Sequence, residues 1–532
     1  MSTDPLFIGV DVGTGSVRVA IVGKGGNVLD SCTRGLTIHN PEVDHYYQSS
    51  DQIWECIRRS ILELCVNVDD AKIKGIAFAG TCSLVVLDQN GPTTLATDAD
   101  GLTHNIIMWM DHRAKVETDM INATRHTALK SVGGSISIEM QPPKLVWLRK
   151  HMKHQFDGAA HFMDLVDWLS YKCTADTTRS QCTVVCKWLY DANEQRSCWN
   201  DDFWATIGLQ CFTSKQHDRI GNKVVAPGHA IGCGLCEETA KCLGLQPSTP
   251  VGAGLIDAHA GVLTLLAAVS KTGLDPLSSL CIISGTSVCH MAQSSTPQFI
   301  HGVWGPYFGA ILDGKWLNEA GQSAVGNVLD RIVDRYGLGH NDVLDYIDRQ
   351  GDSLTTAKLA GDLHVWPDYH GNRSPLSNPN MTGALLGLRL DDIGPVVADD
   401  KDNALRLCAR QYVAHVQSFA YMTKLIVSQM SNYRFSNVAL CGGLQRNRLY
   451  VQTHADVLEK PVVLPNCEHP VALGAAMLAM CATGTSLPAA MEYLAPGASV
   501  IEPEPKTVAF HERKYKIFEK LGEIVKKTTD ER

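Results

Sequence analysis

The sequence has no apolar run long enough to cross a lipid bilayer. The nearest candidate, residues 251–269, is interrupted by Asp257 and His259, whereas a spanning helix needs about 20 predominantly apolar residues. The chain also has no long Lys/Arg run, and its 47 basic and 56 acidic residues give a net charge of −9. Neither a nucleic acid nor an anionic membrane surface is therefore expected as its main partner.

Signals for export and for disulfide cross-linking are missing as well. Residues 1–5 lack the basic-then-apolar pattern of a signal peptide. The 18 cysteines are scattered without a repeating framework, which favours reduced thiols and a cytoplasmic protein. Cys233 and Cys236, with Cys242 nearby, have the spacing of half a zinc knuckle, but no matching second pair follows. A metal is therefore not expected at these cysteines.

The Walker-type P-loop, Gly-x-x-x-x-Gly-Lys followed by Ser or Thr, is absent too. What is present is the composition of a globular protein, with 532 residues of which 45% are apolar and 19% charged. A chain of this length exceeds the size of one hydrophobic core, so at least two domains are expected.

Residues 6–22 are the most informative stretch. Two short apolar strands, 6–10 and 17–22, are expected to flank a tight glycine-rich turn. Glycines there allow a positive φ and a close approach of the backbone to a ligand, so that N–H groups can converge on phosphate oxygens. An ordinary hairpin is the alternative, because glycine-rich turns are common. The candidate phosphate-binding residues are Gly13, Thr14, Gly15, Ser16 and Arg18, with Asp11 as the candidate ligand of the accompanying cation.

Strand and helix patterns alternate after this hairpin. Residues 28–37 can supply a third strand, residues 49–64 have the capping serine and apolar spacing of a helix, and residues 73–79 form a short apolar strand. Such alternation is typical of an α/β architecture. Ser83 follows the last of these strands, and residues beyond the carboxyl ends of parallel strands face the ligand crevice of such sheets.

Two later segments place polar side chains in apolar surroundings. Trp109, Asp111 and Arg113 lie at the end of an apolar run; the carboxylate could accept sugar hydroxyls with the arginine fixing it in place, or the two charges could form a simple salt bridge. Lys187 lies in the apolar segment 182–188. Because buried lysines are seldom left unpaired, we expect either a carboxylate partner or an anionic or polyhydroxyl ligand for Lys187.

Asp257 is the most suggestive acidic residue. It follows the strand-like run 251–256 and precedes a helix pattern of small residues. Its carboxylate is therefore expected near a helix N-terminus, which favours the ionised form that a general base needs. A simple helix N-cap is the structural alternative.

The segment 281–292 is similar to the first hairpin, with apolar residues on both sides of Gly285-Thr286-Ser287. This weak internal repeat predicts two related domains that each present a phosphate-binding hairpin to a shared cleft. Further along, Glu319 is expected in a Gly-bounded turn before a helix at residues 324–333.

The last third of the chain continues the α/β pattern. Residues 437–447 indicate a strand, a Gly442-Gly443 pair and a helix start; two glycines let the backbone pass against a flat ring, to which Asn447 can hydrogen-bond. Helices are also expected over residues 140–154, 161–172, 405–430 and 470–482, with an amphipathic helix at 514–527 that packs on the surface. The polar loop 366–375 is either functional or a rigid connection.

Four of these stretches, in this order, resemble the FGGY carbohydrate kinases: Asp-Val-Gly-Thr-Gly-Ser, Leu-Ile-Asp-Ala-His-Ala-Gly, Ser-Gly-Thr-Ser and Cys-Gly-Gly-Leu-Gln-Arg-Asn. The resemblance covers nearly the whole chain. It implies an α/β protein with two actin-like (ribonuclease H-like) domains and an interdomain catalytic cleft for ATP and a sugar. We accordingly expect domains at residues 6–265 and 280–483 and a C-terminal extension with an amphipathic helix at 484–532.

The resemblance also assigns roles to residues. Asp257 matches the family's catalytic base, and Asp11 with the first hairpin matches its metal and phosphate site. Ser83, Asp111, Lys187 and Glu319, together with Asp257, fall where ribulokinases line the sugar pocket. The remaining ATP-binding positions are Gly285, Thr286 and Ser287 in the second hairpin, and Gly442, Gly443 and Asn447 in the adenosine loop.

Within the family, the segments 108–114, 185–188 and 318–323 resemble those of ribulokinases, and the whole sequence is similar to eukaryotic D-ribulokinases of this family. The Arg-Glu pair typical of glycerol kinases is absent near Ser83, and Thr81-Cys82-Ser83-Leu84 replaces the Met-His-Gly stretch of many xylulose kinases. Segment 142–147 departs slightly from the family signature, which leaves its role open.

The expected activity is ATP- and Mg²⁺-dependent phosphorylation of the terminal C5 hydroxyl of a ketopentose, above all D-ribulose. L-ribulose, another ketopentose or a polyol of the same family remains an alternative, because epimers differ only in hydroxyl placement. A non-catalytic, nucleotide-gated binding protein on the same scaffold is the rival from a different class. The partners implied are small molecules, and a homodimer is left open.

Overall fold

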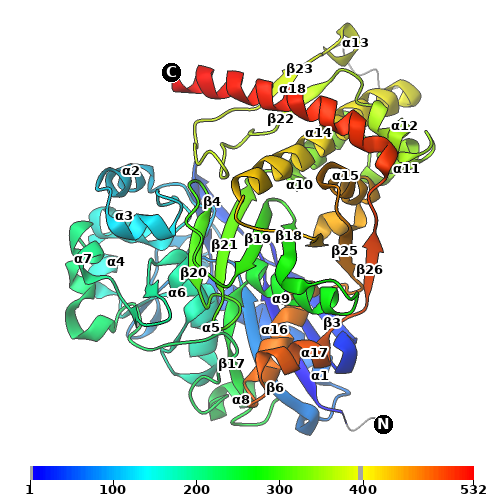
Figure 1. Ribbon diagram of the computed structural model, residues 1–532. Coiled ribbons are helices and arrows are strands. Elements are labelled where there is room, and N and C mark those ends of the chain that lie inside the picture. The colour runs from blue at the N-terminus through cyan, green and yellow to red at the C-terminus, as the bar shows by residue number, and fades with distance from the viewer. Residues whose placement is uncertain (1–3, 394–399, 532) are drawn as a thin grey trace.

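The computed structural model describes residues 4–393 and 400–531 and contains two large β-sheets enclosed by helices (Figure 1). Residues 1–3, which contributed to the expectation about export, lie outside the described residues. The first sheet has the strand order β17-β6-β1-β2-β3. Strands β1 to β3 form an antiparallel meander, and β6 and β17 continue the sheet in parallel with β1. The bounds are Leu6–Val12 (β1), Ser16–Val22 (β2), Val28–Gly35 (β3), Ile73–Gly80 (β6) and Val251–Ile256 (β17).

Every residue of β1 and β17 is buried, as expected for strands that are covered on both faces of a sheet. Strands β3 and β6 confirm the third strand and the strand at residues 73–79 that the sequence predicts. The first hairpin is confirmed as well, although β1 extends two residues beyond the predicted end.

The second sheet repeats this order within β20-β21-β19-β18-β24-β25-β26. Here β18, β19 and β21 form the antiparallel meander, and β24 and β25 continue in parallel with β18. The bounds are Ser279–Ser284 (β18), Val288–Ser294 (β19), Trp304–Phe308 (β20), Trp316–Gln322 (β21), Asn437–Cys441 (β24), Val462–Pro465 (β25) and Ala498–Ile501 (β26). Both five-stranded cores thus have the same connectivity, which confirms the internal repeat and the pair of actin-like domains.

Two helices from opposite halves of the chain lie between the sheets (Figure 1). Helix α9 (Asp257–Ser270) follows the first sheet but packs on β18, β24 and β25 of the second, whereas α16 (Pro470–Cys481) packs on β1 and β6 of the first. A Cβ atom at Gly474 would lie 2.0 Å from the carbonyl oxygen of Ala260, and one at Gly9 would lie 1.9 Å from that of Ala472. Only glycine permits backbones to approach this closely.

A smaller sheet in the first half, with the order β12-β7-β11-β5-β4 and β8 paired to β7, supports one wall of the cleft described below. Its main strands are His39–Glu42 (β4), His45–Gln48 (β5), Leu84–Asp88 (β7), Ile106–Ile107 (β11) and His161–Asp164 (β12). The single helix predicted over residues 161–172 is therefore wrong in its first part. Residues His161–Asp164 pair with β7, and helix α5 (Leu165–Thr174) begins after them, because sheet pairing overrides local helical periodicity.

The helices with clear start signals form where the sequence predicts. Helix α1 (Ser50–Cys65) is capped by Ser49, whose side chain accepts a hydrogen bond from the Gln52 N–H. The other helices with at least seven residues are Lys115–Ala123 (α2), Gln141–His151 (α3), Gln181–Lys187 (α6), Glu237–Leu243 (α8), Gly326–Arg335 (α10), His340–Asp348 (α11), Lys401–Gln429 (α14), Arg448–Leu458 (α15) and Leu487–Leu494 (α17).

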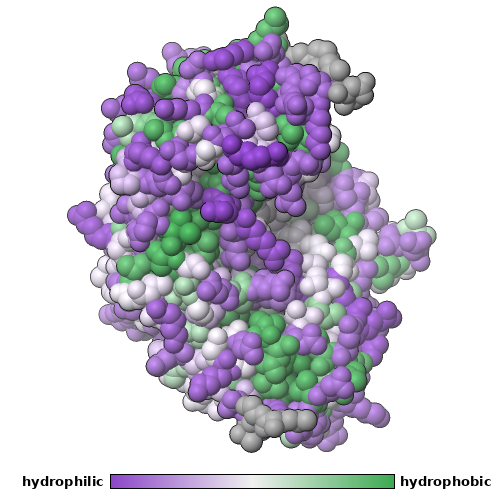
Figure 2. All heavy atoms as spheres, turned by 90° about the vertical axis from the view of Figure 1, so that its right-hand side faces the viewer, coloured by the Kyte–Doolittle hydropathy of each residue, from purple (hydrophilic) through white to green (hydrophobic). Residues whose placement is uncertain are grey.

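The C-terminal helix α18 (Pro505–Asp530) packs on the second half, which confirms the predicted surface helix. Its Phe518 ring stacks on Trp366 with ring centroids 4.7 Å apart, and a Cβ atom at Gly522 would lie 2.3 Å from the same indole. Hydrophilic residues dominate the upper part of the face shown in Figure 2, where the second half lies. Among residues 4–393 and 400–531, no helix is both long and apolar enough to cross a membrane.

Candidate active site

A cleft of about 710 Å³ lies between the two halves. Both hairpin turns, the start of α9, strand β21 and the turn after β24 contribute to its walls. Of the residues singled out in the sequence as candidate functional residues, those that line the cleft are Asp11, Gly13, Thr14, Gly15, Ser16, Arg18, Trp109, Lys187, Asp257, Gly285, Thr286, Ser287, Glu319, Gly442, Gly443 and Asn447. Ser83 and Asp111 do not line it.

The two hairpin turns have similar geometry. In the first, the Gly13 N–H donates to the Ser16 carbonyl at 3.0 Å, and in the second the Gly285 N–H donates to the Ser287 carbonyl at 2.9 Å. The positive φ expected at Gly13 and Gly15 is wrong, since neither adopts it. A Cβ atom at Gly15 would instead meet nothing within 4 Å, so the missing side chain leaves open space over the turn for a ligand.

The first turn is fixed by the wall next to it. The Trp109 Nε1–H donates to the Thr14 hydroxyl at 3.0 Å, and the Gln48 side chain donates to the Thr14 carbonyl at 2.9 Å. Such supporting hydrogen bonds hold the turn in one conformation before any ligand binds.

Asp11 and Arg18 face each other across the first hairpin. The Arg18 guanidinium donates to Asp11 Oδ2 at 3.0 Å, with the carboxylate buried and the arginine side chain 41% exposed. Burial and the nearby charge of Asp257 raise the pKa of Asp11 to about 7, against the opposing effect of Arg18. The negative charges of Asp11 and Asp257 repel each other, and a bound cation would relieve that repulsion.

Asp257 is the first residue of α9, directly after the carboxyl end of β17. Its Oδ1 accepts the Ala258 N–H at 2.7 Å. Burial raises the pKa of the Asp257 carboxyl group, whereas that N–H and the charges of His259 and Lys187 oppose the increase. A carboxylate with a raised pKa at the floor of a cleft is suited to accept a proton.

Lys187 and Glu319 approach the same part of the cleft from different halves. Lys187 ends α6, and its ammonium lies 4.5 Å from the ring centroid of Trp304. Within the described residues it makes no hydrogen bond or ion pair. Burial favours a lower pKa for Lys187, but the acidic groups of Cys82 and Glu319 outweigh it and raise the pKa. The ammonium group of Lys187 is therefore charged, and its three N–H groups donate to no acceptor among the described residues.

Glu319 does not lie in a Gly-bounded turn, as the sequence predicts, but in the middle of β21 between β19 and β20. The flanking glycine belongs to the strand, where Arg373 packs against Gly321. Burial favours a higher pKa for Glu319, but Lys187 and His259 outweigh it and lower the pKa to about 2. Glu319 is thus held as an anion at the side of the cleft.

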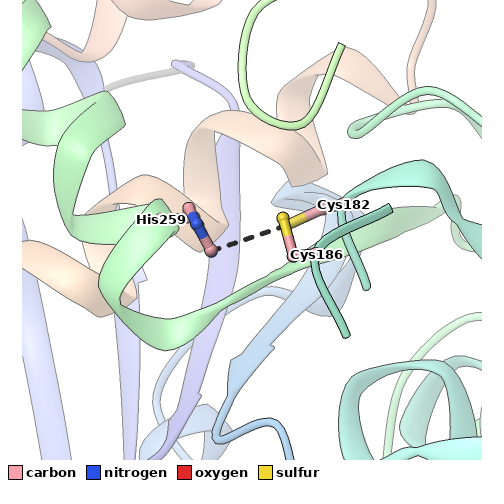
Figure 3. A group of neighbouring side chains, drawn as sticks. All are labelled: Cys182, Cys186 and His259. Carbon is pink, nitrogen blue, oxygen red and sulfur yellow. Dashed lines mark hydrogen bonds between the residues drawn. The ribbon is translucent and has the colours of Figure 1, made fainter. Parts of the chain in front are cut away.

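His259 lies between Glu319 and two buried cysteines. Figure 3 shows its imidazole beside Cys182 and Cys186. Its Nδ1 lies 3.6 Å from Cys182 Sγ, and its Nε2 lies 3.4 Å from Glu319 Oε2. Burial favours a lower pKa for His259, but Cys182 and Glu319 raise it to about 10. Cys182, Cys186 and His259 form the one group of three close metal-type ligands in the described part of the chain. A structural zinc site needs a fourth ligand. The exposed Cys233 and its neighbours form no such group.

Ser83 and Asp111 lie behind the wall of the cleft, which corrects their predicted place in the sugar pocket. The Ser83 hydroxyl accepts the Trp109 N–H at 3.2 Å and pairs with the Thr81 hydroxyl at 3.0 Å. Asp111 receives two hydrogen bonds from the Arg113 side chain, at 2.8 and 2.6 Å, with neither side chain exposed. Since their polar atoms are taken by the protein, both residues position the wall and have no contact with the cleft.

The far end of the cleft is formed by the turn after β24. Gly442 has φ of +99°, and a Cβ atom there would lie 2.3 Å from the Ser284 carbonyl oxygen, so only glycine fits. Gly443 has open space where a side chain would be. Asn447 caps α15 by accepting the Tyr450 N–H at 3.1 Å and donates to the Tyr412 hydroxyl at 2.9 Å. Its amide is therefore already engaged within the protein.

Several cleft residues were not predicted from the sequence as site residues: Thr81, Cys82, Glu139, Trp304, Asp330, His340, Tyr412, Arg446 and, within the polar loop 366–375, Arg373. For Arg373, the polar composition of the loop was a sequence signal of a possible functional role. Glu139 had no such signal, because it is an isolated charged residue before a helix and belongs to no motif.

Comparison with known proteins agrees with this geometry. The profile of the FGGY family of carbohydrate kinases matches with its N-terminal domain at residues 6–264 and with its C-terminal domain at residues 280–483. The FGGY carbohydrate kinase domain-containing protein of Danio rerio is 41% identical, covering 97% of both chains. The D-ribulokinase of Saccharomyces cerevisiae is 31% identical, covering 90% of this chain and 72% of that protein.

Solved structures agree on the fold. The crystal structure of gluconate kinase from Lactobacillus acidophilus superposes with a TM-score of 0.80 at 18% identity, covering 98% of both chains. The duplicated sheets, the cleft between them and the matching profiles together show that this chain belongs to the FGGY family of carbohydrate kinases, which transfer phosphate from ATP to a sugar.

Proposed function

We propose that the protein transfers the γ-phosphate of ATP to the C5 hydroxyl of a ketopentose, with D-ribulose as the preferred acceptor and D-ribulose 5-phosphate as the product. The observation that carries this proposal is that Asp257 lines the same cleft as the two hairpin turns, Lys187 and Glu319. The similarity to the yeast D-ribulokinase supports the choice of sugar.

The charges at the sugar end favour a neutral polyhydroxyl acceptor. This part of the cleft is lined by three carboxylates and two cations: Glu139, Asp257 and Glu319, and Lys187 and Arg373. Carboxylates accept hydrogen bonds from hydroxyl groups, and the cations donate to hydroxyl or keto oxygens. A sugar acid would instead require an excess of positive charge.

The reaction follows from these positions. Asp257 accepts the proton of the C5 hydroxyl while that oxygen attacks the γ-phosphorus, and ADP leaves on the opposite side. The backbone N–H groups and hydroxyls of the two turns bind the phosphate oxygens on which charge develops. Glu319, held as an anion, and the charged Lys187 orient the sugar.

Magnesium fits the residues present. Carboxylate oxygens are the ligands that Mg²⁺ prefers, and Asp11 would hold it at the turn end of the cleft. When bound, it would supply positive charge to the β- and γ-phosphates.

A coupled assay of ADP release across D-ribulose, L-ribulose, D-xylulose, ribitol and glycerol tests the proposal. We expect ATP consumption only with an added acceptor and the highest kcat/KM with D-ribulose. Preference for another acceptor would contradict the substrate assignment. ATP binding without any acceptor-dependent turnover would favour the nucleotide-gated binding protein.

Gly15→Val is expected to weaken ATP binding selectively. The new side chain would fill the open space over the first turn, where the protein itself has no atom within 4 Å of a Cβ position. We expect at least a tenfold increase of the KM for ATP, equivalent to about 1.4 kcal/mol, with an unchanged KM for the sugar. Gly158→Val is the matched control, because Gly158 also has free space around its Cβ position but is exposed at the end of α4 (Lys153–Gly158), outside the cleft. Equal KM values for ATP in both variants would refute the turn as a phosphate site.

Glu319→Gln is expected to raise the KM for the sugar by about 10- to 100-fold, because a charged hydrogen-bond acceptor to a hydroxyl is worth about 1.5–3 kcal/mol. Steady-state kinetics with each substrate varied in turn measure the effect. The exposed Glu63→Gln serves as the control. A sugar KM that stays at the wild-type value would exclude Glu319 from the pocket.

A further inference from the structure

The polar loop that follows β22 (His364–Trp366) has an internal hydrogen-bonded frame. Asp368 accepts the Trp366 indole N–H at 2.7 Å and the Asn372 side-chain N–H at 2.9 Å. The Asn372 Oδ1 in turn accepts the Leu376 N–H at 2.8 Å. These bonds fix the backbone on both sides of Arg373, which is the one side chain of the loop that reaches the cleft.

Arg373 lies where the two halves meet. Its Nη2–H donates to Glu139 Oε1 at 2.8 Å, although the two residues are 234 positions apart. The guanidinium carbon lies 5.9 Å from the Trp109 ring centroid and 5.7 Å from that of Trp304. Trp109 and Glu139 belong to the first half and Trp304 to the second, so Arg373 contacts both walls.

The arginine is not fully satisfied by the protein. Its side chain is 8% exposed, and its buried Nε–H has no hydrogen-bond partner among the described residues. Leaving a buried donor without an acceptor is unfavourable. The stem packs on Gly321, two residues beyond Glu319 on the same face of β21: a Cβ atom at Gly321 would lie 2.9 Å from Arg373 Cδ. The guanidinium is thereby placed beside the candidate sugar ligands.

We infer that Arg373 is a further substrate-binding residue, whose free N–H groups donate to a hydroxyl or keto oxygen of the acceptor while its ion pair with Glu139 joins the two walls around it. The inference rests on the proposed carbohydrate kinase site. It deepens that proposal, because specificity would depend on a residue outside the family's short motifs. The indole rings hold the guanidinium plane, and an ammonium cannot donate to Glu139 and to a sugar in the same geometry.

Arg373→Lys, Arg373→Gln and Glu139→Gln test this inference, with the exposed Arg389→Gln as the control. The acceptor used is whichever compound of the panel the wild-type enzyme turns over best. A panel result that rejects D-ribulose would thus contradict the proposed substrate without preventing this test. For Arg373→Lys we expect at least a tenfold increase in the acceptor KM, an unchanged KM for ATP and a thermal midpoint close to that of the wild type.

Glu139→Gln is expected to raise the acceptor KM less, because the guanidinium remains. The acceptor should also raise the thermal midpoint of the wild type and of Arg389→Gln but not that of Arg373→Lys. An acceptor KM in Arg373→Lys equal to that of the control would overturn the inference. A loss of activity in proportion to the loss of folded protein, with both KM values unchanged, would overturn the inference as well. Should Arg373→Gln fail to fold, the lysine variant and Glu139→Gln decide the outcome.

Discussion

Replacing Asp257 by Asn is expected to lower kcat by about 10²–10⁴-fold, the range typical of a lost general base. The amide has nearly the same shape but cannot accept the hydroxyl proton at neutral pH. Its oxygen can still accept the Ala258 N–H that the carboxylate receives at 2.7 Å, so the start of α9 should be preserved. Coupled kinetics at saturating sugar and ATP, together with a nucleotide-binding titration, measure the two effects separately.

The control is Asp30→Asn, on the exposed strand β3, which should leave both turnover and ATP affinity unchanged. A variant of Asp257 that kept near-normal turnover would contradict its role as the base. A variant that lost ATP binding in proportion to turnover would point instead to a role in holding the nucleotide.

Replacing Gly474 by Ala is expected to lower the thermal midpoint markedly. Helix propensity alone would make this change stabilising by about 1 kcal/mol, because alanine is the better helix former. The added methyl group would however lie 2.0 Å from the Ala260 carbonyl oxygen, so α9 and α16 must move apart. Overpacking of this kind costs about 1–3 kcal/mol and sometimes more, and both sheets pack on these helices.

Gly158→Ala, at the end of α4 (Lys153–Gly158), is the matched control because nothing lies within 4 Å of its Cβ position. Differential scanning calorimetry of the two variants should show a lower midpoint only for Gly474→Ala. An equal or higher midpoint for Gly474→Ala would mean that the two helices can separate without loss of stability.

The sequence predicts the elements that local signals define. The hairpins at residues 6–22 and 281–292 are visible because each has apolar strands around a Gly-Thr pair, and Ser49 marks the start of α1. Asp257 could be placed because a strand ends and a helix begins at that residue. Each of these signals lies within one short segment.

The predictions that failed depend on partners far away in the chain. Glu319 is in a strand because β19 and β20 pair with it on both sides, which the glycines around it do not reveal. Asp111 is removed from the cleft because Arg113 and the Tyr46 N–H occupy its oxygens. Whether a carboxylate is already satisfied depends on such contacts and on burial, so its residue type alone cannot show it.

Arg373 and Glu139 illustrate the same limit for the site. Each is an ordinary charged residue in its own segment, and only the packing of the two halves brings them together at 2.8 Å. The positive φ expected at Gly13 and Gly15 failed for another reason. A glycine can be required by the space that a ligand needs as well as by backbone conformation.

A crystal structure with a non-hydrolysable ATP analogue and D-ribulose is the most direct measurement. Our expectation is that the triphosphate lies between the turns at residues 13–16 and 285–287, with the C5 hydroxyl within hydrogen-bond distance of Asp257. A triphosphate bound elsewhere, or a sugar whose hydroxyl groups all lie away from Asp257, would contradict it.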